Sequence, residues 1–112
     1  MTESTEVRQM LTDAATRLFA DHVTQKMLAT AKHEGWSADL WRELERAELP
    51  LVGVSEDAGG AGGSLSDAAA VLRIAAKHAA PVPLAETCLA GWLLSGSELK
   101  VPRGPLTIGP VL

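Results

Sequence analysis

The residues that could perform acid–base or metal chemistry are few and widely spaced in this 112-residue chain. Glu56 and Asp57 are adjacent carboxylates, but a catalytic base needs a partner pocket and a perturbed pKa. Loop carboxylates of this kind usually act as solvated or capping groups. His22, His33 and His78 lack metal-ligand spacing. We therefore predict no catalytic residue and no metal site in this chain.

A glycine-rich loop spans residues 55–64, with four glycines in five positions at Gly59, Gly60, Gly62 and Gly63. Such a loop could cradle a phosphate group. However, it lacks the Lys and Ser/Thr pattern of a P-loop, and no strand clearly precedes it. We therefore interpret the glycines as turn formers and predict no cofactor-binding residue here.

The single cysteine, Cys88, cannot form an intrachain disulfide or by itself make a zinc site. It falls within an apolar helical pattern, and no nearby histidine in the sequence suggests an activated thiolate. We interpret Cys88 as a small buried hydrophobic residue.

Composition narrows the class of protein. Hydrophobic residues make up 46% of the chain, charged residues 21% and aromatic residues 4%, which is typical of one small globular domain with an aliphatic core. The net charge of -4 and the scattered basic residues argue against a nucleic-acid or membrane-surface partner. The polar start is unlike a signal peptide, so we expect a cytoplasmic location.

Apolar residues recur at steps of three and four, which predicts an all-α bundle of about five helices. The expected helices span residues 5–20, 23–33, 37–48, 64–79 and 83–95. The predicted buried face of the first helix contains Val7, Met10, Leu11, Ala14, Leu18 and Phe19.

Local signals mark where two of these helices begin. Ser37 is a predicted N-cap, and Trp36 and Trp41 flank it at the spacing of a hydrophobic staple. Ser64 is a predicted N-cap with Asp67 as its capping-box partner, three residues along.

The helix predicted over residues 83–95 has two apolar faces. Leu84, Cys88 and Trp92 share one face at four-residue steps, and Leu89 and Leu93 share another. One face should pack into the domain and the other should meet further domains. Plain core packing remains an open alternative for both faces, because apolar stripes at helical spacing usually belong to a core.

The helical pattern ends at residue 96, and prolines and glycines follow it. This suggests a helical domain over residues 1–96 and a linker over residues 97–112. Residues 106–108 favour a strand, but an isolated strand is not stable. We interpret the extended tail as the start of a missing β-domain, so that the chain would be the N-terminal part of a longer protein.

Three consecutive segments together resemble a known family. Residues 40–44 (LWREL), 49–54 (LPLVGV) and 55–64 (SEDAGGAGGS) are similar, in order and spacing, to the N-terminal domain of acyl-CoA dehydrogenases. The segment PVPLAET at residues 81–87 resembles the form found in bacterial and actinobacterial members. The resemblance covers roughly residues 5–96.

The resemblance implies a three-domain flavoprotein. FAD would lie mainly between the middle and C-terminal domains, and a carboxylate from the C-terminal domain would remove the α-proton of an acyl-CoA while the β-hydride goes to the flavin. The N-terminal domain would provide scaffold and one wall of the acyl pocket, with Leu84, Cys88 and Trp92 as the candidate substrate-binding residues. No FAD is expected on this chain alone.

The partners implied are the missing β- and C-terminal helical domains, acyl-CoA, and further subunits of a homo- or hetero-oligomer. Residues 95–105 look abbreviated relative to ordinary members and resemble divergent ones, some of which are non-catalytic partners of an active subunit. The alternatives to an enzyme domain are therefore a structural subunit or a free-standing helical interaction module.

Overall fold

The computed structural model describes residues 3–109, with side chains from residue 5 onward. Its elements are α1 (Glu3–His22), α2 (Gln25–Glu34), α3 (Ala38–Arg46), a single 3-10 turn η1 (Glu56–Ala58), α4 (Leu65–Lys77) and α5 (Leu84–Gly96). No strand is present within the described residues, where the only β-type pairing is an isolated bridge between Val52 and Gly62. The predicted all-α fold with five helices is confirmed.

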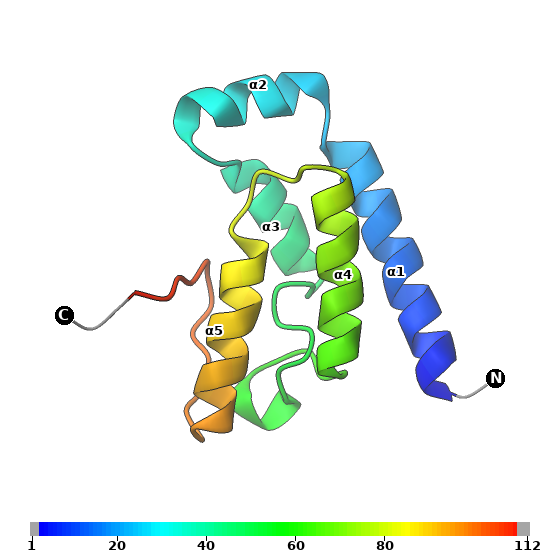
Figure 1. Ribbon diagram of the computed structural model, residues 1–112, viewed down its shortest axis with the longest axis vertical. Coiled ribbons are helices and arrows are strands. Elements are labelled where there is room, and N and C mark those ends of the chain that lie inside the picture. The colour runs from blue at the N-terminus through cyan, green and yellow to red at the C-terminus, as the bar shows by residue number, and fades with distance from the viewer. Residues whose placement is uncertain (1–2, 110–112) are drawn as a thin grey trace.

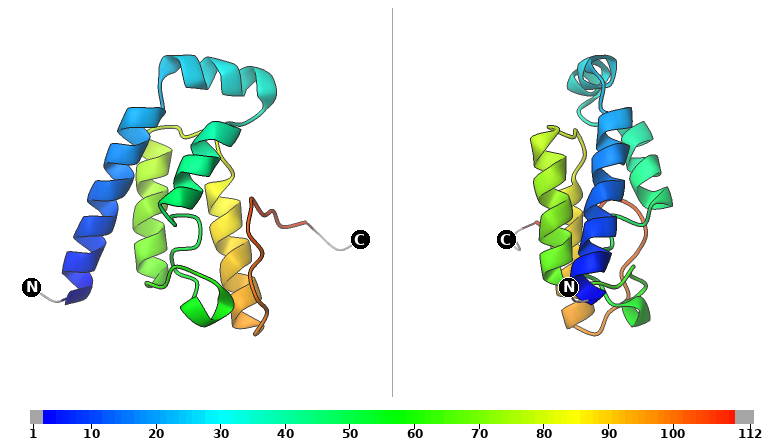
Figure 2. Two further views of the ribbon diagram at one scale, coloured as in Figure 1. Left: turned by 180° about the vertical axis from the view of Figure 1, so that it is seen from behind. Right: turned by 90° about the vertical axis from the view of Figure 1, so that its right-hand side faces the viewer.

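The helices form a layered arrangement. Helices α1, α4 and α5 lie side by side, and α2 crosses one end of the molecule (Figure 1). Helix α3 lies on one side of this layer, over α4 and α5 (Figure 2). The opposite side of α4 and α5 has no helix over it in either figure.

The main core lies where α1, α3, α4 and α5 meet. Phe19 and Val71 are fully buried, and so are Leu40 and Leu44 from α3. Leu84 of α5 joins the same cluster at 2% exposure. Burying apolar side chains is the main force that stabilises such a bundle.

The predicted helix starts are confirmed by their hydrogen bonds. Ser37 Oγ accepts from the N–H of Leu40 at 3.1 Å, and the rings of Trp36 and Trp41 meet edge to face at 6.3 Å between centroids. Thr24 caps α2 by accepting from the Met27 N–H, a cap that the sequence analysis did not identify. These caps satisfy N–H groups that a helix leaves without intrahelical partners.

The predicted buried face of α1 is partly wrong. Ala15 is fully buried, whereas the predicted Ala14 is exposed. Val7 and Met10 also belong to the predicted stripe, but they are 49% and 72% exposed. Helix α1 packs against α4 and, less extensively, α3, and the packed domain leaves Val7 and Met10 largely uncovered.

The tail after α5 turns back along that helix (Figures 1 and 2). Residues 106–108 have no assigned secondary structure, so the predicted strand is not formed within the described part of the chain. Val101 is buried in a second small core with Val54 and Ala58. The division at residue 96 stays a prediction, although the packed unit continues past it.

Among the described residues, no helix has both the length and the apolar character needed to cross a membrane.

Candidate functional site

The three residues predicted for an acyl-pocket wall lie on α5, but the structure separates them. Leu84 is 2% exposed and Cys88 is 7% exposed, and both pack into the main core. Trp92 is 46% exposed on the surface. The domain itself therefore occupies the surroundings of Leu84 and Cys88, and only Trp92 is available to an external group. Their role in binding stays a prediction.

The exposed side of α5 is apolar. Leu89 and Leu93 are 50% and 47% exposed, so they accompany Trp92 on the surface. We call Leu89, Trp92 and Leu93 the outer α5 face. A shallow, open depression borders it, lined by Trp92 and Leu93 together with Gly53 and Gly63. Exposed clusters of large apolar side chains are typical of surfaces that contact other molecules.

The inner side of α5 packs tightly because it carries small residues. Ala90 and Gly91 are buried, and a Cβ atom on Gly91 would lie 3.1 Å from Cγ2 of Val54. Thr87 is fully buried on the same helix. The small side chains let α5 approach the turn at residues 49–54, which fixes the direction of the outer α5 face.

The thiol of Cys88 is held in an apolar environment. Its sulfur lies 3.6 Å from the carbonyl oxygen of Pro50. Burial raises the pKa of the Cys88 thiol to about 11, because a thiolate is poorly stabilised away from water. The thiol therefore stays protonated at neutral pH, which is unlike a catalytic cysteine.

The glycine-rich loop is hydrogen-bonded to the preceding turn rather than open. The N–H of Gly62 donates to Val54 O at 2.8 Å, and the N–H of Gly53 donates to Gly62 O at 2.9 Å. A Cβ atom on Gly60 would meet Val54 O at 2.2 Å. The space beside Gly60 is thus filled by this chain itself. The glycine at position 60 thus serves a close approach between two backbone segments.

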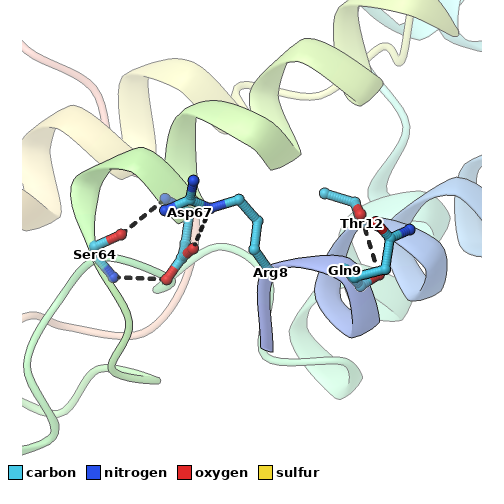
Figure 3. Close-up of polar contacts among 5 residues, drawn as sticks. All are labelled: Arg8, Gln9, Thr12, Ser64 and Asp67. Carbon is cyan, nitrogen blue, oxygen red and sulfur yellow. Dashed lines mark hydrogen bonds and ion pairs between the residues drawn. The ribbon is translucent and has the colours of Figure 1, made fainter. Parts of the chain in front are cut away.

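An ion pair joins α1 to the start of α4 (Figure 3). Arg8 Nε donates to Asp67 Oδ1 at 2.9 Å, while the Ser64 N–H donates to Asp67 Oδ2 at 2.9 Å. Ser64 Oγ in turn accepts from the Asp67 N–H, which completes the predicted capping box. The hydrogen bond from Arg8, followed by that from the Ser64 backbone, lowers the pKa of the Asp67 carboxyl from its usual 3.8. The group is structural: it positions two helices.

The other candidate residues from the sequence do not gather into a site. Glu56 and Asp57 are exposed at η1. His78 lies against the carbonyl of Ile74 at 3.0 Å, near the end of α4, and its ring stacks on Phe19 at 5.9 Å between centroids. Within the part of the chain that the structure describes, no group of three His, Cys, Asp or Glu side chains is placed to hold a metal ion.

A small cavity that the sequence did not predict lies between the end of α3 and the tail. Its lining residues are Trp41, Glu45, Glu48, Pro50, Leu51, Gly59, Gly60, Ala61, Pro102, Arg103 and Gly104. The indole N–H of Trp41 is buried without a hydrogen-bond partner among the described residues. No sequence signal points to this cavity, since it depends on where residues 102–104 return to the domain.

Comparison with known proteins identifies the class. The family described as "Acyl-CoA dehydrogenase, N-terminal domain" matches residues 5–98. The chain therefore belongs to the acyl-CoA dehydrogenase family and corresponds to its N-terminal helical domain. The predicted resemblance is confirmed, and it rests on the helix, turn and glycine loop that build the scaffold.

Particular relatives come from mycobacteria. "Acyl-CoA dehydrogenase IpdE2" of Mycobacterium tuberculosis is 38% identical over 88 residues, which are 76% of this chain and 28% of that protein. The protein of the same name from Mycolicibacterium smegmatis is 35% identical over 88 residues, again 76% of this chain and 28% of its own. "Acyl-CoA dehydrogenase FadE34" of Mycobacterium tuberculosis is 41% identical over 71 residues, 60% of this chain and 10% of that protein. The chain thus spans less than a third of the curated relatives it matches. No solved structure gives a significant match.

Proposed function

We propose that this chain serves as the N-terminal domain of an FAD-dependent acyl-CoA dehydrogenase, in which it provides scaffold and part of the acyl-pocket wall. The observation that carries the proposal is the outer α5 face. Leu89, Trp92 and Leu93 are each about half exposed, on the side of α5 that faces away from the buried core. An apolar acyl chain or a neighbouring apolar domain would remove these side chains from water, which is favourable.

The other two candidate residues, Leu84 and Cys88, would support this face from the core side of α5. Leu84 and Cys88 pack in the core and hold α5 in place. In our proposal they position Trp92 and do not touch the acyl chain themselves. The protonated state of Cys88 fits this supporting role, since it places no charge beside the proposed pocket.

The reaction itself belongs to other parts of the complete protein. FAD, when bound there, would accept the hydride in an α,β-dehydrogenation of an acyl thioester. The residues described here supply no base for that reaction in our proposal. Their task is to exclude water from the acyl chain and to orient it.

The first test is the coding sequence after Leu112. We expect it to continue into a β-rich segment and then a second helical domain, as a three-domain dehydrogenase requires. A stop codon directly after Leu112 would contradict the proposal and favour a free-standing helical module.

The second test is the visible absorption spectrum of the complete purified protein. We expect a flavin spectrum that bleaches when acyl-CoA thioesters of increasing chain length are added anaerobically. A complete protein that carries no flavin would overturn the proposal and identify a non-catalytic subunit. A flavin spectrum that no acyl-CoA bleaches would also contradict the assigned reaction.

A further inference from the structure

The tail after α5 is attached to the helical domain at two separate places. Leu106 lies beside Thr87, in the first turn of α5, whereas residue 97 follows the last turn. Residues 97–106 therefore run antiparallel to α5 along its length (Figures 1 and 2). Attachments near the two ends of this segment fix its path.

The first attachment is apolar. Val101 is 7% exposed and packs with Val54, Ala58 and Leu94. Its N–H donates to the carbonyl of Ala58 at 3.0 Å. A buried side chain and a backbone hydrogen bond together hold this point of the tail to the η1 turn.

The second attachment centres on Thr87, while the Leu106 side chain also packs against the cluster of Val54, Ala58 and Val101. Thr87 Oγ1 donates to the carbonyl of Pro83 at 2.7 Å and accepts from the N–H of Leu106 at 3.0 Å. Next to it, Thr107 Oγ1 donates to Glu86 Oε2 at 2.5 Å. Thr87 is fully buried, and a buried hydroxyl needs its hydrogen bonds satisfied. The backbone of Leu106 meets this need from outside the helix.

Two prolines restrict the backbone of the segment between the attachments. Pro102 and Pro105 have restricted φ angles and no backbone N–H. Residues 102–104 also form one wall of the cavity at Trp41, so the tail closes that cavity from one side.

We propose that residues 99–107 form a strap held to the helical domain near both of its ends, and that Thr87 sets the direction in which the chain leaves the domain. The strap is a conformational device that does not depend on acyl-CoA chemistry. Any segment that follows residue 107 would start from the position that Thr87 and Glu86 give it.

Hydrogen exchange of the Val101 and Leu106 amides, measured by NMR on the 112-residue chain, tests the strap. In the unaltered chain we expect both amides to be protected, because each donates a hydrogen bond to the packed domain. A Leu106 amide that exchanges as fast as in an unfolded peptide would overturn the proposal. This measurement needs no substitution, so it stands even where a variant fails to fold.

Two substitutions of Thr87 test the contribution of its hydroxyl group and that of its shape separately. Thr87→Val should speed exchange at Leu106 about tenfold, the equivalent of one lost hydrogen bond, and leave Val101 unchanged. Thr87→Ser keeps the hydroxyl and should preserve protection at Leu106. A folded Thr87→Val chain with unchanged exchange at Leu106 would contradict the role of Thr87, and so would equal loss at both amides.

A spin label tests the exit direction. A nitroxide attached through Gly109→Cys should broaden the amide signals at the start of α5, since Thr107 lies against Glu86. In the Thr87→Val background this broadening should weaken. Broadening that is identical in both backgrounds would show that Thr87 does not set the exit.

Discussion

Gly60 lies against the backbone of Val54 so closely that a Cβ atom on Gly60 would be 2.2 Å from the Val54 carbonyl oxygen. That carbonyl accepts the N–H of Gly62 at 2.8 Å, so it is part of the hydrogen bonding that closes the glycine loop. The glycine is therefore required by a close approach between two backbone segments. This gives a physical reason for one part of the pattern by which the family was identified.

Gly60→Ala should destabilise the domain by about 3 kcal/mol, because a methyl group there must displace backbone atoms. Chemical unfolding followed by circular dichroism measures the change. Gly96→Ala is the matched control: Gly96 is the last residue of α5, and a Cβ there meets no atom within 4 Å. The control should be neutral or slightly stabilising. Equal stability of the two variants would refute the close-contact explanation.

Most local features of this fold were predictable, because each depends on residues close in sequence, although the Thr24 cap of α2 was missed. Ser37 and Ser64 cap their helices through neighbours three residues away, and Trp36 meets Trp41 five residues on. Fold class and family followed from the same kind of information.

Features that depend on distant segments were not predictable. The exposure of Val7 and Met10 depends on which part of α1 contacts α4. The contact of Thr87 with Leu106 joins residues 19 positions apart through a tail that looked like a linker. A buried threonine in an apolar helix predicts that its hydroxyl is hydrogen-bonded, but it does not identify the partner.

Asp67→Asn should lower stability by about 1 kcal/mol at neutral pH, because it removes the charge that Arg8 and the Ser64 N–H bind. The loss depends on pH. The pKa of Asp67 is lower in the folded chain, so its carboxylate stabilises the fold at neutral pH. That contribution falls away from about pH 5 downward, as the group becomes protonated in both states.

Unfolding curves at several pH values check this dependence. The unaltered chain and the Asp67→Asn variant should differ at pH 7 and converge in acid. Asp57→Asn is the control, because Asp57 is an exposed carboxylate on η1. Its difference from the unaltered chain at pH 7 should be smaller than that of Asp67→Asn. A constant gap between the unaltered chain and Asp67→Asn would contradict the ionic part of the explanation.

The Cys88 thiol should resist alkylation in the folded chain. Its pKa of about 11 leaves little thiolate at neutral pH, and its burial hinders access. We expect iodoacetamide to modify Cys88 only as fast as the chain opens, and rapidly in denaturant. Ser66→Cys adds an exposed thiol on α4 as an internal control. Mass spectrometry should then show one fast and one slow modification, and two equal rates would contradict the buried position.

Leu84→Ala and Trp92→Ala should separate the supporting role of α5 from its outer face. Leu84 is 2% exposed, so its truncation should cost about 3 kcal/mol of stability in the isolated chain. Trp92 is 46% exposed, so its truncation should cost less stability.

In the complete protein, Trp92→Ala should affect acyl-CoA binding more than Leu84→Ala does. Trp92→Ala should raise the acyl-CoA concentration needed to bleach the flavin, at unchanged flavin content. Ala85 is exposed on the same helix, and Ala85→Ser serves as a surface control that should alter neither property. Unaltered acyl-CoA titration in Trp92→Ala would remove the outer α5 face from the acyl pocket and leave it as a surface for contact between domains or subunits.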